Sequence, residues 1–264
     1  MQTQPQQMRS PMTRKLRRSY SLGVGASFFA VLIVLTAQAS SLPLFVLPVN
    51  YDSQNPGALV VADINGDGKL DLVVTGCGGS CGNTDGVVMV RLGNGDGTFR
   101  PAAVYGSGGV YAESVAVEDL NHDGKPDVVV ANCAPSGTGP CQTGSMEGVV
   151  GVLLGNGDGT LRHAVTYDSG GLSAESIAVA DVNRDGKPDL VVANSGLGYG
   201  VGVLLGKGDG TFQPPSTYSP NTQIFSLAVA DVNGDGNPDI VGGGAIDGQI
   251  SIGVLMATVL SSHR

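Results

Sequence analysis

The stretch that decides the fold is D-I-N-G-D-G-K-L-D at Asp63–Asp71, and three similar stretches follow it along the chain. They are D-L-N-H-D-G-K-P-D at Asp119–Asp127, D-V-N-R-D-G-K-P-D at Asp181–Asp189 and D-V-N-G-D-G-N-P-D at Asp231–Asp239, and successive copies start 56, 62 and 50 positions apart. We call these four segments aspartate loops 1 to 4. Each stands between two short apolar runs, such as A-L-V-V-A before loop 1 and L-V-V-T after it. Short apolar runs joined by Asp/Asn/Gly turns at a regular spacing are typical of strands in repeated β units.

A second turn, G-N-G-D-G-T or G-K-G-D-G-T, follows three of the four loops and leads into an F/L-x5-Y strand. Phe45–Tyr51 has the same strand pattern with no unit before it, whereas the last unit ends after G-Q-I-S-I-G-V-L-M without the turn. An extra strand at the start and a missing strand at the end are what a permuted propeller would show. In such a propeller the first strand of the chain pairs with the last blade. The sequence therefore predicts an all-β fold, a β-propeller-type array of about four four-stranded blades, incomplete or open. The predicted repeats occupy residues 40–264, at approximately 45–98, 99–160, 161–211 and 212–258.

Composition excludes several other classes of protein. Glycine accounts for 42 of the 264 residues and charged residues for only 14%, which argues against long helices and coiled coils. The formal net charge is −9, and five of the 14 basic residues precede Tyr20, so the rest of the chain is strongly acidic. Because phosphate contacts need clustered Lys and Arg, no nucleic-acid partner is expected.

The N-terminus has the pattern of an export signal. Residues 1–18 are polar and basic, residues 22–37 are apolar, and Ala37-Gln38-Ala39 is a small-x-small end that suits a signal peptidase. The sequence predicts a signal peptide over 1–39, a secreted, periplasmic or cell-surface location, and no membrane span in the mature chain. The alternative is an uncleaved signal anchor, although the apolar run is short for a bilayer.

The four cysteines agree with export. Cys77 and Cys81 lie in one glycine-rich segment, Cys133 and Cys141 in another, and each pair follows an apolar strand. This spacing favours two local disulfides, Cys77–Cys81 and Cys133–Cys141. A zinc site made of all four cysteines is the alternative, disfavoured by an oxidising compartment and irregular spacing.

The aspartate loops carry the candidate chemistry. Positions 1, 3, 5 and 9 bear hard oxygen donors, and the glycine at position 6 permits the sharp turn that directs alternate side chains to one centre. The backbone carbonyl of position 7, contributed by Lys69, Lys125, Lys187 and Asn237, can join them. This matches the first nine positions of a calcium loop, without a glutamate at position 12. A plain Asx/Gly turn is the alternative interpretation.

Together, these motifs resemble the VCBS/FG-GAP repeat family, whose calcium-loop β-propeller repeats also form integrin α-subunit heads and occur in many secreted bacterial proteins. The resemblance covers about residues 45–258. It implies one Ca²⁺ per loop and an extracellular binding or adhesion scaffold with an unspecified protein or glycan ligand. The expected metal-binding residues, including the position-7 carbonyls, are Asp63, Asn65, Asp67, Lys69, Asp71, Asp119, Asn121, Asp123, Lys125, Asp127, Asp181, Asn183, Asp185, Lys187, Asp189, Asp231, Asn233, Asp235, Asn237 and Asp239.

Family propellers usually have more blades than these four. The alternatives are an unusually small ring, an open arc, pairing with another copy, or a fragment of a longer ancestor. Asp96, Asp158 and Asp209 of the G-D-G-T turns are interpreted as hairpin-turn residues, with weak metal binding as the alternative.

Catalysis finds little support in the sequence. The chain has three histidines, none of them in a recognisable catalytic setting, and no G-x-S-x-G nucleophile motif. We therefore expect a secreted calcium-binding scaffold and not an enzyme. One alternative is a purely structural or truncated propeller fragment without a ligand. A propeller-based hydrolase or lyase is less favoured, because the fold alone does not decide activity.

Overall fold

The structure is a computed structural model that describes residues 49–51, 55–78, 85–135, 146–196, 200–218, 223–246 and 249–255. The chain divides into two compact units, Met1–Leu47 and Pro48–Arg264, and all described residues belong to the second. The signal peptide and its signal-anchor alternative therefore lie outside the described residues. The described residues form strands and turns without a helix, which confirms the all-β prediction. Among them there is accordingly no helix with the length and apolarity needed to cross a membrane.

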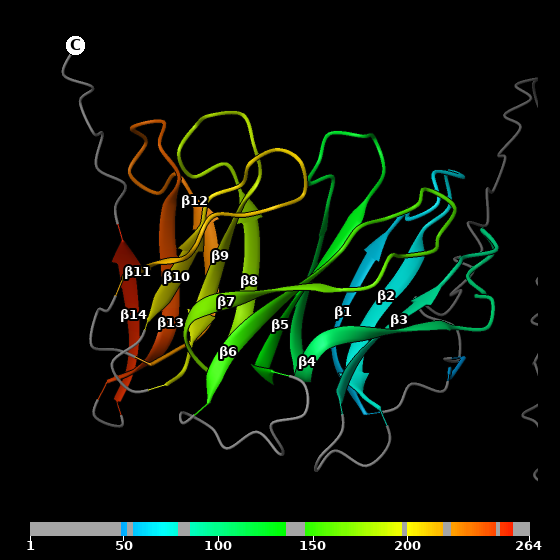
Figure 1. The fold of residues 1–264 in the computed structure, drawn as a ribbon, viewed down its shortest axis with the longest axis horizontal. Helices are drawn as coiled ribbons and strands as arrows, with labels where there is room; N and C mark the ends of the chain where they lie inside the picture. Colours follow the sequence, from blue (N-terminus) through cyan, green and yellow to red (C-terminus); the bar gives the residue numbers. More distant parts are fainter. Residues whose placement is uncertain are drawn as a thin grey trace, which may run out of the picture. The chain divides into compact units, whose positions relative to one another are not determined.

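The strands follow one another as antiparallel neighbours in three sheets (Figure 1). The sheet orders are β1-β2-β3-β4-β5-β6-β7, β11-β10-β9-β8 and β12-β13-β14. Strand bounds are β1 Pro56–Ala62, β2 Asp71–Cys77, β3 Asp85–Arg91, β4 Ala103–Glu118, β5 Asp127–Pro135, β6 Glu147–Leu153, β7 Val165–Leu172, β8 Ala174–Ala180, β9 Asp189–Asn194, β10 Val201–Leu204, β11 Ser216–Tyr218, β12 Gln223–Ala230, β13 Asp239–Ile246 and β14 Gln249–Leu255.

The long strand β4 serves two blades. Its first part, from Ala103 to Gly106, pairs with β3, whereas its second part, as far as Glu118, pairs with β5, with register shifts in both ladders. Blade 1 is thus β1, β2, β3 and the start of β4, and blade 2 is the rest of β4 with β5, β6 and β7. Blade 3 is β8 to β11, and blade 4 is β12 to β14. Within the described residues blade 4 has three strands, and the residues beyond Leu255 lie outside them, so the predicted absence of a further strand stays a prediction.

The hydrophobic core lies between successive blades. Along β5, Val128 and Val130 pack with residues of blade 1, whereas Val129 and Ala131 pack with residues of blade 3. The same alternation holds along β9, whose residues pack in turn with blade 2 and blade 4. Because side chains of a strand point alternately to opposite faces, each inner blade contributes to two core layers. Among the described residues the core is therefore three inter-blade layers and a smaller cluster of Val110, Cys133 and Ala134 within blade 2.

The segments that cross from one blade to the next are fixed by buried polar contacts. Where β4 crosses into blade 2, the Ser107 hydroxyl donates to Asn132 Oδ1 at 2.5 Å, and Ser169 and Asn194 repeat this contact at 2.7 Å before blade 3. At the first crossing the backbone passes so close to β6 that only glycine fits there. A Cβ at Gly151 would lie 1.8 Å from the Ser107 carbonyl oxygen.

We predict that Gly151→Ala destabilises the protein by about 2 kcal/mol, because the added methyl group must displace backbone. Gly253 is the matched control, because it occupies the equivalent register position in blade 4, and a Cβ added there would have no heavy atom of the described residues within 4 Å. Gly253→Ala should change stability by less than about 0.5 kcal/mol. The measurement is the denaturant midpoint, and equal effects of the two substitutions would contradict the packing described.

Candidate metal centre

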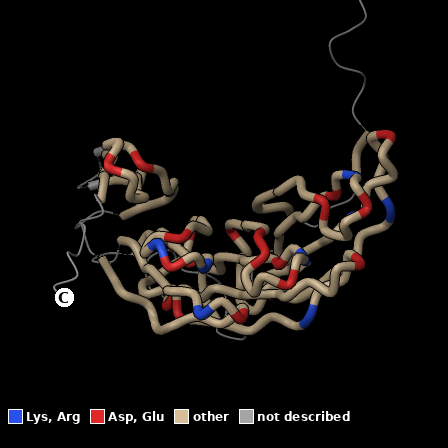
Figure 2. Tube along the Cα trace, turned by 90° about the horizontal axis from the view of Figure 1, so that it is seen from above, with Lys and Arg blue, Asp and Glu red and all other residues tan. Residues whose placement is uncertain are grey.

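Each aspartate loop joins the first strand of a blade to its second strand. Loop 1 connects β1 with β2, and loops 2, 3 and 4 connect β4 with β5, β8 with β9 and β12 with β13. The tube view shows Asp and Glu gathered in turns between the strands (Figure 2). The ninth position of each loop is the first residue of the following strand, at Asp71, Asp127, Asp189 and Asp239. The repeat therefore places the same polar turn at the same place in all four blades.

Side chains at positions 1, 3 and 5 fold back onto the backbone of the loop. In loop 1, the Asp67 amide donates to Asp63 Oδ1 and to Asn65 Oδ1, and the Gly68 amide donates to Asp63 Oδ2. The Lys69 amide donates in turn to Asp67 Oδ1. The same four bonds recur in loops 2, 3 and 4, and all sixteen lie between 2.8 and 3.2 Å. Oxygens of positions 1 and 3 thus converge on one amide in every copy.

The backbone of the loops makes two left-handed steps, at positions 4 and 6. Position 6 is glycine in all four copies, with φ between 78° and 85°. Position 4 is glycine in loops 1 and 4, but His122 in loop 2 and Arg184 in loop 3, with φ of 58° and 62°. A side chain at such a φ is strained, so the surrounding hydrogen bonds impose the conformation at these two residues. No catalytic function is needed to explain the position of His122.

The aspartate at position 9 has a role that sequence reasoning missed. Asp71 is fully buried, and both of its carboxylate oxygens accept backbone amides. Ile64 of the loop donates at 3.0 Å, and Gly93, at the end of the third strand, donates at 2.7 Å. Asp127 and Asp189 make the same pair of bonds in blades 2 and 3. In the first three blades the ninth residue therefore clamps the loop to the segment that follows the third strand of the same blade.

The carboxylates of one loop lie close enough to affect one another. Burial raises the pKa of Asp127, two amide hydrogen bonds lower it, and the charges of Asp123 and Asp119 raise it. Asp189 has a raised pKa for the same reasons, through its own two loop neighbours. A cation bound among these groups would remove the repulsion.

The donor set of the loops fits calcium better than any softer metal. Each loop offers carboxylate and amide oxygens, which are the ligands of hard cations. In loop 4, Asp231 Oδ1 and Asp235 Oδ1 each accept two hydrogen bonds, so an ion there would have to displace a donor or use the other oxygens. Among the described residues, however, no group of three or more His, Cys, Asp or Glu side chains is already arranged as a metal site. In loop 1 the position-5 carboxylate also contacts the Lys69 ammonium, at 3.6 Å from Asp67 Oδ2. The calcium assignment stays a prediction, supported by donor chemistry.

The cysteines occupy equivalent places in blades 1 and 2. Cys77 and Cys133 each lie six residues after the buried position-9 aspartate, and both are buried. Neither is a free cysteine. The expected partners, Cys81 and Cys141, lie outside the described residues, so the two pairings and the zinc alternative stay as predicted from the sequence.

The G-D-G-T aspartates are hairpin-turn residues, as predicted. Asp96 Oδ1 accepts the amide of Thr98 at 2.9 Å and its hydroxyl at 2.6 Å, and these bonds lower the pKa of Asp96. Asp158 and Asp209 make the same pair of bonds with the threonine two residues on. In each of these turns, one oxygen of the aspartate therefore accepts two hydrogen bonds from the threonine of the same turn.

A tyrosine contacts the phenylalanine that follows the first and the third G-D-G-T turn. Tyr167 of blade 2 contacts Phe212 of blade 3 edge to face, with ring centroids 5.5 Å apart. Tyr51 makes the same contact with Phe99 of blade 1, also at 5.5 Å, and its hydroxyl accepts the Phe99 amide at 3.1 Å. Tyr51 thus stands on blade 1 as the tyrosine of a preceding blade would.

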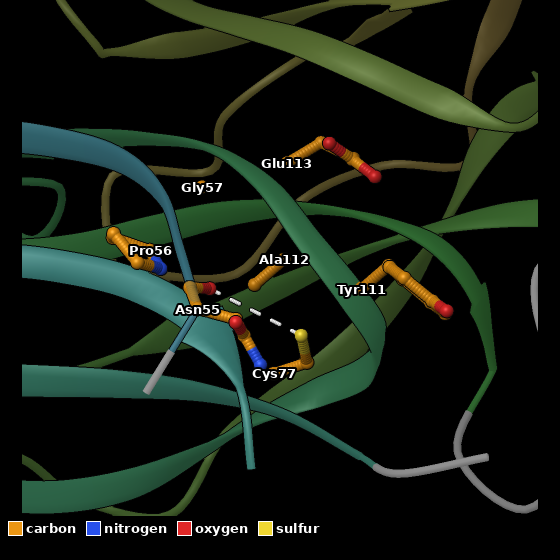
Figure 3. Close-up of a pocket in the computed structure, with 8 residues that line it drawn as sticks. Asn55, Pro56, Gly57, Cys77, Tyr111, Ala112 and Glu113 are labelled. Atoms are coloured by element: carbon orange, nitrogen blue, oxygen red, sulfur yellow. Dashed lines mark hydrogen bonds between the residues drawn. The ribbon is translucent and has the colours of Figure 1, made fainter. Parts of the chain in front are cut away.

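A pocket of about 340 Å³ opens between β1, β2 and β4 (Figure 3). Glu113 and Tyr111 lie on its β4 side, and Asn55 and Cys77 on the other, where the cysteine Sγ lies 4.0 Å from the Asn55 carbonyl oxygen. Burial and the nearby charge of Glu175 raise the pKa of Glu113. No motif in the sequence pointed to this pocket, because its walls come from separate strands.

Four blades that carry the same aspartate turn and pack face to face define a repeat protein built of propeller-type β blades. A profile described as FG-GAP-like repeat matches residues 63–130, 142–192 and 181–242, and the chain belongs to this family. No curated protein matches the sequence. Among solved structures, the V. cholerae biofilm matrix protein Bap1 is similar with 20% identity and a TM-score of 0.33. The match covers 72% of this chain and 35% of that chain.

We predict that Asp71→Asn destabilises the protein by about 2 kcal/mol in calcium-free buffer. In the wild type, both oxygens of Asp71 accept backbone amides. In the variant one of these oxygens becomes an NH₂ group, so that two donors would face each other and one buried amide would lose its acceptor. Asp96→Asn is the matched control, because only one oxygen of Asp96 accepts bonds and the asparagine carbonyl can replace it. Urea denaturation compares the two variants. Equal, small effects would show that the clamp contributes nothing.

Proposed function

We propose that the chain is an extracellular binding scaffold whose blades are stabilised by calcium in the four aspartate loops. The observation that carries the proposal is the fourfold repetition of one loop geometry, with oxygens of positions 1 and 3 converging on a single amide. A simple turn needs only one or two such bonds. The four loops also concentrate negative charge, because together they hold twelve of the 23 acidic residues of the chain.

Positions 1, 3 and 5 with the carbonyl of position 7 would hold the ion, as in loop 3 with Asp181, Asn183, Asp185 and Lys187. Calcium supplies positive charge and a set of oxygen bonds that link these positions. The position-9 aspartate would act mainly as the clamp, with one further lone pair on each oxygen available to the ion. The loop would thereby be fixed at both ends.

Three further observations support an extracellular scaffold. Residues 1–39 have the pattern of an export signal, and neither described cysteine is free. The repeat family is the second support, because the resemblance implies a binding or adhesion role. The third is the candidate site, which offers turn-forming and metal-binding groups in place of a nucleophile with its base. The ligand would be a protein or a glycan, and a glycan array with and without calcium tests the second class.

We predict that calcium-stripped protein binds four Ca²⁺ per chain in a calorimetric titration, with dissociation constants of about 10⁻⁴–10⁻³ M. Asp185→Ala should reduce the number to three, because it removes the position-5 carboxylate of loop 3. Asp209→Ala removes an equally exposed carboxylate from a G-D-G-T turn and should leave four sites. A chelator should lower the melting temperature, since binding to the folded state alone stabilises it. Absence of calcium binding, together with an unchanged melting curve, would show that the loops are only turns.

A further inference from the structure

Each of the first three blades packs its third strand against the blade that follows. The residues in contact are Val88 and Val90 of blade 1, Val150 and Val152 of blade 2, and Val201 and Val203 of blade 3, all buried. Strand register makes Ile252 and Val254 of β14 their equivalents in blade 4, because Leu255 pairs with Ile240 as Leu204 pairs with Leu190. In blade 4 these two side chains are 76% and 43% exposed. We call this surface the tail face.

The opposite end of the array has a matching surface. Val115 of blade 2 and Ile177 of blade 3 pack against the blade before them and are buried. By register with the second strand, Leu59 of β1 is their equivalent in blade 1, yet it is 56% exposed and Val61 is 50% exposed. We call this surface the head face. Exposed apolar side chains at positions that are otherwise core indicate a missing partner.

An independent contact indicates which partner the head face takes. Tyr51 contacts Phe99 as Tyr167, on the fourth strand of blade 2, contacts Phe212 of blade 3. Tyr51 therefore stands where the tyrosine on the fourth strand of a blade before blade 1 would lie. Blade 4 is the blade that lacks a fourth strand among the described residues. A blade 4 placed on the head face would meet both the apolar surface and residues 49–51, which stand at the place of a fourth strand.

We infer that the tail face of one copy docks on the head face of a second copy, so that the chain associates head to tail. Blade 4 of the same chain does not cover the head face, because Leu59 and Val61 are exposed and the tail face is exposed as well. A second copy would repeat the packing that already occurs three times within the chain. Such an interface joins two different surfaces, so it closes into a ring or continues as a linear array.

The test is light scattering of the purified protein over a range of concentrations. The wild type should show at least twice the mass of its own monomer at high concentration. Ile252→Asp and Leu59→Asp should each be monomeric, because each loses one of the two faces. Val165→Asp is the matched control, since Val165 is an apolar residue, 56% exposed, outside both faces, and this variant should associate like the wild type.

Mixing the two monomeric variants separates head-to-tail docking from other modes. Ile252→Asp keeps an intact head face and Leu59→Asp an intact tail face, so an equimolar mixture should form a complex of two chains and no larger species. Circular dichroism and melting curves establish that each variant is folded. A wild type that is monomeric throughout, a Leu59→Asp variant that associates as the wild type does, or folded variants that stay monomeric when mixed would each overturn the inference.

Discussion

Each blade of this protein depends on one buried carboxylate, the aspartate that ends its loop and begins its second strand. Asp71, Asp127 and Asp189 are fully buried, and each accepts one amide from its own loop and one from the end of the third strand. A buried charge without such partners would be costly, whereas here both oxygens are satisfied by donors of fixed geometry. The clamp therefore sets the loop conformation and the register of three strands together.

With the loops fixed, the rest of the fold follows from alternation along the strands. A residue such as Val129 contributes to one inter-blade layer and its neighbour Val130 to the other, so every inner strand must be apolar on both faces. The same rule makes the two end blades different from the inner ones. Their outward faces keep the apolar residues of the repeat, and no further blade of the described residues covers them.

Local features of the structure could be predicted from the sequence, because they depend on residues close together in the chain. The aspartate loops and the G-D-G-T turns were both evident from motif spacing. The partners of the ninth aspartate were not, since Gly93 lies 22 residues beyond Asp71 and only strand pairing brings them together. The contact of Ser107 with Asn132 and that of Tyr51 with Phe99 were missed for the same reason. In each case tertiary packing, and not a motif, selects the partner.

Different positions of the aspartate loop have different roles. Position 9 holds the loop in place, whereas positions 1, 3 and 5 present oxygens to the candidate ion. Anomalous diffraction from crystals grown with calcium tests this division most directly. The account predicts one calcium peak in each of the four loops, about 2.3–2.6 Å from side-chain oxygens of positions 1, 3 and 5. In loops 1, 2 and 3 the position-9 carboxylate should still accept its two amides. Well-ordered loops without a peak, or calcium found only elsewhere, would contradict it.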